Sequence, residues 1–487
     1  MMHPLLLAMS LPVLTAVVVA LSGRRPNLRD SLMVVGALLT FVANIVVAVL
    51  VGQGKTLSIA LAEPFSGHPI AFAADPAGLI YALVASGLWP ITAIYAVGYM
   101  RGHHEKNQTR FFMFFSLSIA FALWIAYSRN LITLFSGYEA LTLCTYPLVT
   151  HHQNDDAIRA GRVYLGILVS TSVMFLLLAL LWTIDLAGTG EFRLGGILPA
   201  NLDQFTVAAL AALFVFGTGK AAVMPFHRWL PAAMVAPTPV SALLHAVAVV
   251  KAGVFTITRV AMFVFGFDQI SRAGIWLPSV AAWTMLVAGM IAIGKDNLKA
   301  RLAWSTISQL SYIVLGATLA TAAGAVGALL HIVMHATGKI TLFFAAGALQ
   351  VAAHKKSVSQ LDGIARRMPW TMAAFAIGTV AIIGLPPTGT IWSKWFLARG
   401  AIDAGRPLFA AVVMAGSLLS VAYLVPVVIR AWLRPLPDGV EATSLEREHP
   451  LIVAPLVVTA LLSIGLLIGG GWIADVLTAW IARGGQP

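Results

Sequence analysis

Eight ionisable residues stand inside or beside long apolar segments of this sequence. The lysines among them are four of only ten in the whole chain. A charged side chain at the centre of a bilayer costs about 2.5 to 3.5 kcal/mol, so such residues are paired, face internal water or lie on a transport pathway. The pattern indicates a relay for protons. The candidate proton-transfer residues are Glu139, Lys220, His245, Lys251, His331, His335, Lys339 and Lys394.

Glu139 and Lys220 form the first pair of interest. Glu139 is the only carboxylate well inside an apolar segment, which makes it the expected ion-pair partner of Lys220. Burial lowers the proton affinity of a lysine and a nearby carboxylate restores it, so separating the pair would release a proton. Two alternatives stay open: Glu139 lies close enough to Arg129 to sit near lipid headgroups, and Lys220 could extend toward an interface.

His245 and Lys251 belong to one apolar segment. Six residues turn an α-helix by about 240°, so the two side chains are expected to point to different sides and to serve adjoining water pockets. A histidine satisfied within the core is the alternative for His245.

His331, His335 and Lys339 recur every four residues and therefore share one helical face. Because histidine titrates near neutral pH, this stripe suits proton handling. The histidine spacing also resembles half of a metal site, but no carboxylate or cysteine accompanies it, and no metal is predicted. Lys394 is expected at the end of the relay; Trp392 and Trp395 beside it leave open an anchor near the membrane surface.

Two segments interrupt helical periodicity within apolar sequence. Residues 224–226 read Met-Pro-Phe just after Lys220, and residues 384–389 read Gly-Leu-Pro-Pro-Thr-Gly just before Lys394. Proline removes a backbone donor and clashes with the preceding turn, so a broken helix is expected at each place. Paired broken helices are typical of transporters built from repeats, with the functional site at the breaks.

These residues must be positioned by membrane helices. Hydrophobic residues make up 59% of the 487 positions and charged residues 10%, which excludes a soluble domain. The predicted fold class is an all-α polytopic membrane protein of about 14 transmembrane helices in one membrane domain, residues 1–487. The apolar runs lie at 4–22, 31–51, 77–99, 111–128, 131–150, 163–184, 205–222, 239–264, 275–294, 302–320, 323–350, 370–388, 408–433 and 451–480.

The distribution of positive charge predicts the orientation. The first run lacks a basic residue ahead of it and Arg24 and Arg25 follow it, so it is read as a retained span rather than a signal peptide. Most Lys and Arg residues fall in the odd-numbered loops, which predicts a multi-pass protein of the cell inner (plasma) membrane with both termini on the non-cytoplasmic side. Residues 52–76 are expected to form a small hairpin and 434–449 a solvated loop.

Composition also excludes several classes of function. The formal net charge of +12 is scattered over short loops rather than gathered in a patch, so no nucleic-acid binding is predicted. Cys144 is the only cysteine, so the chain alone holds no disulfide and no iron–sulfur cluster. No GxGxxG follows a strand and no phosphate-binding lysine loop occurs, so neither a nucleotide site nor a cofactor is predicted.

The stretch KAAVMPFHRWLPAAMVAPTPVSALLHAVAVVKAG, residues 220–253, resembles the signature of the proton-conducting antiporter-like subunits of Mrp-type cation/proton antiporters, complex I and membrane-bound hydrogenases. Further similar motifs are IYAVGYM (94–100), GYEALTLCTYPLV (137–149), DNLKARLAWSTISQLSYI (296–313), HATGKITLFF (335–344) and GLPPTGTIWSKWFL (384–397). The resemblance extends from about residue 75 to 430.

The resemblance implies two inverted five-helix repeats, residues 109–264 and 275–433, with broken helices 7 and 12. It makes Glu139 the acidic partner, Lys220 and Lys394 the lysines of the two broken helices, and His245 the central histidine. Lys339 corresponds to the lysine that follows the histidines, with His331 and His335 in the same segment. The lysine at position 251 argues weakly against a subunit of respiratory complex I, where some relatives carry an uncharged residue. The subunit subtype stays open.

The predicted function is that of a proton-translocating subunit in a multisubunit Mrp-like monovalent cation/proton antiporter. The alternative is a proton-pumping membrane-arm subunit of a complex I-like or hydrogenase oxidoreductase, so membership of a redox-driven enzyme complex is left open. The expected partners are other membrane subunits, the lipid bilayer and protons, with Na⁺ or K⁺ undecided; any sodium site is expected in another subunit.

Overall fold

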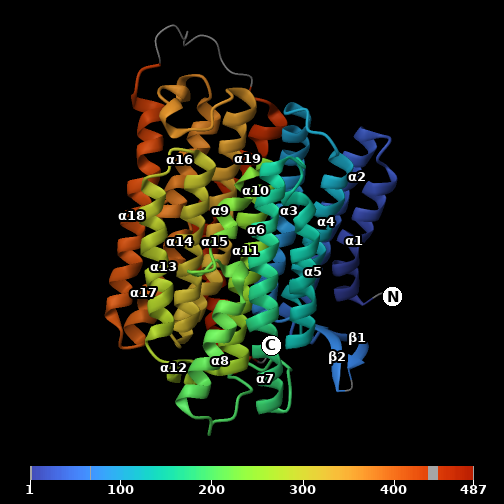
Figure 1. The fold of residues 1–487 in the computed structure, drawn as a ribbon, viewed down its shortest axis with the longest axis vertical. Coiled ribbons are helices and arrows are strands. Elements are labelled where there is room, and N and C mark those ends of the chain that lie inside the picture. The colour runs from blue at the N-terminus through green and yellow to red at the C-terminus, as the bar shows by residue number, and fades with distance from the viewer. Residues whose placement is uncertain (1–2, 66, 437–447, 486–487) are drawn as a thin grey trace.

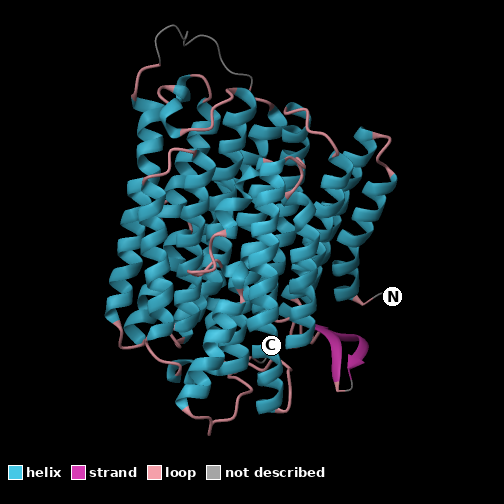
Figure 2. Ribbon diagram, viewed as in Figure 1, coloured by secondary structure: helices cyan, strands magenta, loops and turns pink. Residues whose placement is uncertain are grey.

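The computed structural model describes residues 3–65, 67–436 and 448–485, and almost all of them are helical (Figure 2). The helices run roughly alongside one another in a single bundle, and the two ends of the chain lie toward the same lower end of the view (Figure 1). The fold class predicted from the sequence is therefore confirmed.

The first part of the bundle contains α1 (Pro4–Leu21), α2 (Pro26–Gly52), β1 (Ser58–Phe65), β2 (His68–Ala73), α3 (Pro76–Gly102), α4 (Gln108–Ala126) and α5 (Leu131–Val149). The middle contains α6 (Asp155–Thr171), η1 (Ser172–Leu176), α7 (Leu177–Ala187), α8 (Gln204–Gly217), η2 (Gly219–Ala221), α9 (Trp229–Ala232), η3 (Ala233–Val235), α10 (Thr238–Ala242), η4 (Leu243–Val247), α11 (Val249–Val260), η5 (Ala261–Phe265) and α12 (Gly266–Arg272). The last part contains α13 (Trp276–Ile293), α14 (Leu298–Thr318), α15 (Ala322–Ala352), η6 (Val358–Gln360), η7 (Ile364–Arg366), α16 (Pro369–Ile383), α17 (Thr390–Asp403), α18 (Pro407–Leu433) and α19 (Pro450–Ala482).

Each predicted apolar run coincides with a helix or a consecutive group of helices. Within the described ranges, 10 helices are long and apolar enough to cross a membrane on their own, and α8 and α16 are shorter apolar helices. The predicted number of crossings stays a prediction, because α5 and α14 are not apolar enough to be counted by composition.

Burial divides the bundle into a centre and a periphery. The most apolar stretch of the segment Thr238–Arg272 is 100% buried and that of α15 is 94% buried, whereas α18 and α19 reach only 33%. Peripheral helices carry large exposed apolar side chains, as Leu418 on α18 does. These two enclosed segments hold five of the candidate residues away from the periphery: His245, Lys251, His331, His335 and Lys339.

The two predicted helix interruptions are confirmed. After α8 ends at Gly217, the 3₁₀ turn η2 holds Lys220, and no α-helix follows until Trp229. The helix α16 ends at Gly384, which has a positive φ of 86° that favours glycine, and α17 places Lys394 in its second turn. Both lysines thus lie beside backbone that is freed from helical hydrogen bonding.

Outside the bundle, the predicted hairpin is confirmed as the antiparallel pair β1 and β2. It lies at the lower end of the view in Figure 1. Of the predicted solvated loop 434–449, residues 437–447 lie outside the described residues.

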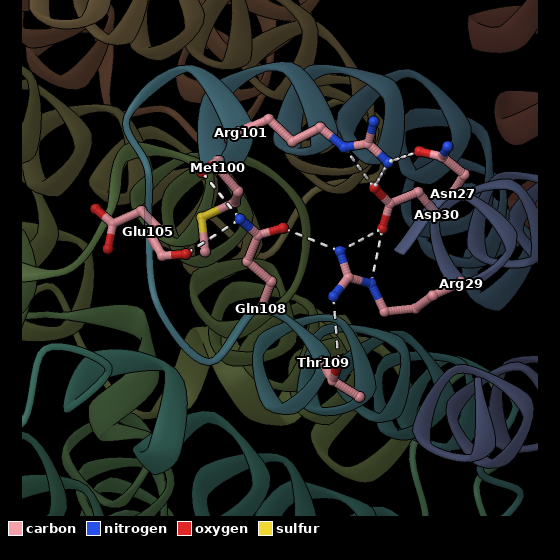
Figure 3. A network of polar contacts seen from close by, with 8 residues as sticks. All are labelled: Asn27, Arg29, Asp30, Met100, Arg101, Glu105, Gln108 and Thr109. Carbon is pink, nitrogen blue, oxygen red and sulfur yellow. Dashed lines mark hydrogen bonds and ion pairs between the residues drawn. The ribbon is translucent and has the colours of Figure 1, made fainter. Parts of the chain in front are cut away.

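A buried ion network joins α2, α3 and the start of α4 (Figure 3). Asp30 accepts from the side chain of Arg29, with which it is buried, and from Arg101 at 2.5–2.8 Å. Arg29 also donates to Gln108 and Thr109 at 2.9 and 3.2 Å. The network ties three helices together at the end of the bundle opposite the hairpin.

Replacing Asp30 by Ala is expected to lower the free energy of unfolding by about 3–5 kcal/mol, because it leaves the buried Arg29 guanidinium without its counter-charge. The loss is read as a drop in the thermal midpoint of the detergent-solubilised protein. Asp156→Ala is the matched control: its pair with Arg159 has both side chains 73% exposed, so a cost under about 1 kcal/mol is expected. Equal losses in the two variants would contradict a structural role for the network.

Candidate functional site

Lys220 is completely buried and is held by α5. Its Nζ donates to the Tyr138 carbonyl and to Thr142 Oγ1, both at 2.6 Å, and lies 3.2 Å from the centroid of the Tyr138 ring. Its backbone N–H donates to the Tyr138 hydroxyl. The broken helix thus presents Lys220 to one turn of α5, where a carbonyl, a hydroxyl and a π-face stabilise an ammonium group.

The expected direct ion pair between Glu139 and Lys220 is not formed. Although the two interact electrostatically, no contact of 4 Å or less joins them, and Glu139 Oε1 is buried without a hydrogen-bond partner. Glu139 follows Tyr138 in α5 and is partly buried, and Leu143, one turn later, is 59% exposed. The acid therefore acts on Lys220 through space rather than through a direct contact.

Lys251 on α11 and His335 on α15 form a direct contact of 2.6 Å between Nζ and Nδ1. Two basic nitrogens at this distance share one hydrogen bond, in which one nitrogen carries the hydrogen and the other accepts it. Both residues are completely buried, and His335 Nε2 has no partner. A single proton can therefore pass between an amine and an imidazole here.

His245 lies in the π-helical turn η4 and contacts the same helix, α15, through Phe343, with ring centroids 4.8 Å apart. Lys251 and His245 thus contact α15 at different places, through His335 and through Phe343. The expectation that the two side chains point to different sides stays a prediction. Both ring nitrogens of His245 are buried without partners, which indicates internal water beside the ring.

His331 joins a continuous hydrogen-bonded chain that ends at Lys339. Its Nε2 lies 3.2 Å from Gln309 Oε1, and Gln309 Nε2 donates to Ser420 at 3.3 Å. From Lys339, at the other end, Nζ donates to the Ser305 hydroxyl at 2.6 Å, and Ser305 donates to the Tyr423 hydroxyl at 3.0 Å. The Tyr423 hydroxyl lies 2.9 Å from Ser420 Oγ, and this contact completes the chain. The predicted stripe on α15 is thus connected sideways, through α14 and α18, rather than along its own helix.

Lys394 is 8% exposed, so the alternative of a surface anchor does not hold. Its Nζ donates to the carbonyls of Ile382 and Ile383 at 3.1 and 2.8 Å and to Ser417 at 2.8 Å. Those carbonyls lie at the end of α16, where the helix break leaves them free of partners within the helix. The second break therefore supplies the oxygens that solvate its own lysine.

A shared serine brings the second break to the histidines. Ser393, the residue before Lys394, contacts His331 Nδ1 at 2.9 Å and also donates to the Thr390 carbonyl at 2.9 Å. A hydroxyl has one hydrogen, so it points to Thr390 when Nδ1 is protonated and can turn to Nδ1 when it is not. The orientation of the Ser393 hydroxyl, next to Lys394 in the chain, can thus depend on whether His331 Nδ1 is protonated.

The sequence predictions missed the neutral members of this site. Ser305, Gln309 and Tyr312 recur at spacings of four and three on α14 and so form a polar stripe on one helical face. Ser420 and Tyr423 repeat the pattern on α18. A search for polar stripes in apolar segments, rather than for ionisable residues alone, could have found them.

Gly253 allows α11 to pack directly against the backbone of Lys220 and Ala221, and a Cβ at this position would overlap both. We expect Gly253→Ala to lower the free energy of unfolding by about 1–3 kcal/mol and to displace the broken helix. Thermal unfolding of the purified protein measures the loss. In Gly166→Ala, the control on α6, the new Cβ would meet no atom within 4 Å, so stability should be retained or rise slightly. An unchanged midpoint for Gly253→Ala would contradict the tight packing.

Comparison with known proteins places these features in context. The family model described as NADH:quinone oxidoreductase/Mrp antiporter, transmembrane, matches residues 128–420. NADH-quinone oxidoreductase subunit N of Desulforudis audaxviator is 32% identical over 457 residues, which cover 88% of this chain and 89% of the relative. Hydrogenase-4 component B of Escherichia coli is 28% identical, covering 86% of this chain and 66% of its own length.

Two solved structures have a similar fold. A chain of the Mrp complex from Dietzia sp. superposes with a TM-score of 0.87 at 23% identity, and a chain of the membrane-bound sulfane sulfur reductase, an archaeal respiratory membrane complex, with 0.85 at 22%. Each comparison covers 100% of this chain and 98% of the other. At these identities the likeness establishes the common fold.

Proposed function

Because this chain belongs to the NADH:quinone oxidoreductase/Mrp antiporter family of membrane subunits, we propose that it translocates protons within a multisubunit Mrp-like cation/proton antiporter. One observation carries the proposal. The buried lysines contact hydroxyls, carbonyls and a histidine, and none of them has a carboxylate within 4 Å among the described residues. Lysines held in this way can change protonation without breaking an ion pair.

The proposed route includes Lys220, His245 and the Lys251–His335 contact, continues along the chain from His331 to Lys339, and ends near Lys394. Glu139 favours the charged form of Lys220 through space. No hydrogen bond links Lys220 or His245 to the later groups within the described ranges, so internal water is required at those two steps. Protons are the transported species in this chain, and the choice between Na⁺ and K⁺ is made elsewhere in the complex.

The predicted organisation belongs to the same proposal. Residues 109–264 and 275–433 are proposed as two inverted five-helix repeats, each with a broken helix that carries a lysine. We propose a place in the plasma membrane with both termini on the non-cytoplasmic side. The unpartnered oxygen of Glu139 and the exposed Leu143 one turn later support a neighbouring membrane subunit against α5, because an unpaired carboxylate close to lipid is costly.

Reconstitution of the purified complex tests the proposal. Vesicles with an imposed pH gradient and an internal pH dye should lose the gradient when Na⁺ or K⁺ is added, and the loss should depend on this subunit. A complex that exchanges neither cation for protons, with or without a redox substrate, would contradict proton translocation.

A redox-driven membrane arm is the second candidate, and the relatives favour it: they are named as subunits of NADH-quinone oxidoreductase and hydrogenase-4. The fold shared with the Mrp complex supports antiport instead. The partners separate the two, since iron–sulfur or nickel–iron subunits copurifying with this chain would identify a redox arm. Proton movement that requires an electron donor would do the same.

A further inference from the structure

A cavity of about 320 Å³ lies at the end of the bundle that carries the 103–107 and 150–154 loops. It is separate from the site described above. Its lining contains one acid, Glu105, together with His103 and His152, and three lysines from α14 and the loop that follows α15: Lys299, Lys355 and Lys356. The rest of the lining is neutral, so the titratable groups of the cavity are its distinguishing feature.

Glu105 is surrounded by imidazoles. Its side chain is 7% exposed, and its carboxylate lies 3.0 Å from His103 Nδ1, 3.5 Å from His152 Nδ1 and 3.8 Å from His151 Nε2. Burial, with smaller contributions from His152 and Arg110, lowers the pKa of His151 to about 4, so this ring stays neutral at physiological pH. His103 and His152 are about one-third exposed, so these two rings lie between solvent and the buried carboxylate.

The ion network of Figure 3 holds this loop in place. Gln108, which accepts from Arg29, donates to the backbone carbonyls of Met100 and Glu105 at 3.2 and 3.1 Å. The carboxylate of Glu105 points away from the network in the figure, on the other side of its backbone. The acid is therefore fixed by its main chain while its side chain stays available.

A polar stripe continues from the cavity toward His245. Thr238 Oγ1 lies behind the lining, 3.4 Å from the Tyr99 hydroxyl and 3.5 Å from the Gln350 side-chain oxygen. Ser241 and His245 follow three and seven residues later, in α10 and η4, and all three residues are completely buried. The Ser241 hydroxyl and both nitrogens of His245 are buried without partners. Buried polar groups of this kind are normally satisfied by water, over about 10 Å from Thr238 to His245.

The facing wall belongs to α15. Gln350 lines the cavity and Phe343 contacts His245, seven residues earlier on the same helical face. Between them stand Ala346 and Gly347, the two small residues on that face. Because Gly347 has no side chain, the Tyr95 hydroxyl and the Thr238 side chain lie directly against α15 at this level.

We propose that this cavity is the inlet through which protons reach His245, with Glu105 as the proton-collecting group at its mouth. The inference rests on the proposed function. Glu105 takes a proton from hydronium, leaving water, and releases it to cavity water, from which it moves past Thr238 and Ser241 to a ring nitrogen of His245. The ammonium groups of Lys355 and Lys356 repel Na⁺ and K⁺ at the mouth, whereas a proton passes by exchange between hydrogen-bonded oxygens.

The test measures initial proton uptake by the reconstituted complex as a function of pH on the side of the 103–107 loop. Glu105→Gln is expected to reduce the rate about tenfold near pH 8, where protons are scarce, and to have little effect near pH 6. Asp156→Asn, which removes a negative charge from the same end of the bundle outside the cavity, should leave the pH profile unchanged. Ser241→Ala removes an unpartnered hydroxyl without loss of a bond and should lower the rate at every pH.

A pH profile for Glu105→Gln that superimposes on that of the unaltered complex would overturn the inlet. His152→Gln is the second variant if Glu105→Gln fails to assemble, and it should shift the profile in the same direction. Lys220→Ala is measured in parallel. If Lys220→Ala abolishes uptake while the cavity variants do not change the profile, the inlet is wrong and the proposed function stands; if Lys220→Ala also transports normally, the function itself is wrong.

Discussion

Lys220→Ala is expected to reduce proton exchange by at least about a hundredfold. The substitution removes the buried titratable group of η2, and neither Tyr138 nor Thr142 can take up its proton at physiological pH. Glu139→Gln should act in the same direction, because the charge that favours the protonated lysine is lost. Cation-driven decay of a pH gradient in vesicles measures both.

The complex should still assemble, since the truncation leaves only a carbonyl and a hydroxyl without their donor, at about 1–3 kcal/mol. Lys55→Ala is the control. Because Lys55 is exposed beside the hairpin, the variant complex should transport normally. Retained exchange by an assembled Lys220→Ala complex would show that protons bypass the first broken helix.

Gln309→Leu is expected to reduce transport about tenfold to a hundredfold. Gln309 is the joint between two stretches of the hydrogen-bonded chain, with His331 on one side and Ser420 on the other. Leucine fills a similar volume but neither donates nor accepts, so the protonation of His331 no longer affects the chain that ends at Lys339. The rate is measured together with assembly, because the change also leaves buried polar groups unpaired.

Ser308→Ala provides the comparison on the same helix. Ser308 is the neighbour of Gln309, but its hydroxyl donates to the Met285 carbonyl on α13, away from the chain. Its loss should alter stability slightly and transport not at all. Equal transport rates for Gln309→Leu and Ser308→Ala would show that the hydrogen-bonded chain has a structural role only.

Much of the fold could be predicted because its determinants are local. Long apolar runs predict membrane helices without any knowledge of the neighbouring helices. The proline segments at 224–226 and 384–389 interrupt a helix because proline lacks a backbone donor and clashes with the preceding turn. The hairpin followed from glycine, proline and short apolar runs. The burial of Lys220, Lys339 and Lys394 followed from their position within apolar sequence.

The contacts between helices could not be predicted in the same way. The pairing of Glu139 with Lys220 was inferred from charge, but the rotation of α5 decides which residue faces the lysine, and it places Tyr138 and Thr142 there. The π-turn at His245 could not be predicted either, because a π-turn adds a residue to one turn without a reliable sequence signal. Neutral hydroxyls and amides escaped notice because they cost less in a membrane than ions do.

The amide of Gln309 gives the chain a polarity. Serine and tyrosine hydroxyls can exchange their donor and accepting roles by a bond rotation, whereas the oxygen and the NH₂ group of an amide stay distinct unless the whole group turns over. Its oxygen accepts from His331 and its nitrogen donates to Ser420, so the two ends of this link between α15 and α18 are chemically different. A proton taken up at the oxygen and another released from the nitrogen leave the imidic acid, so the group must tautomerise or turn over before it can pass the next proton.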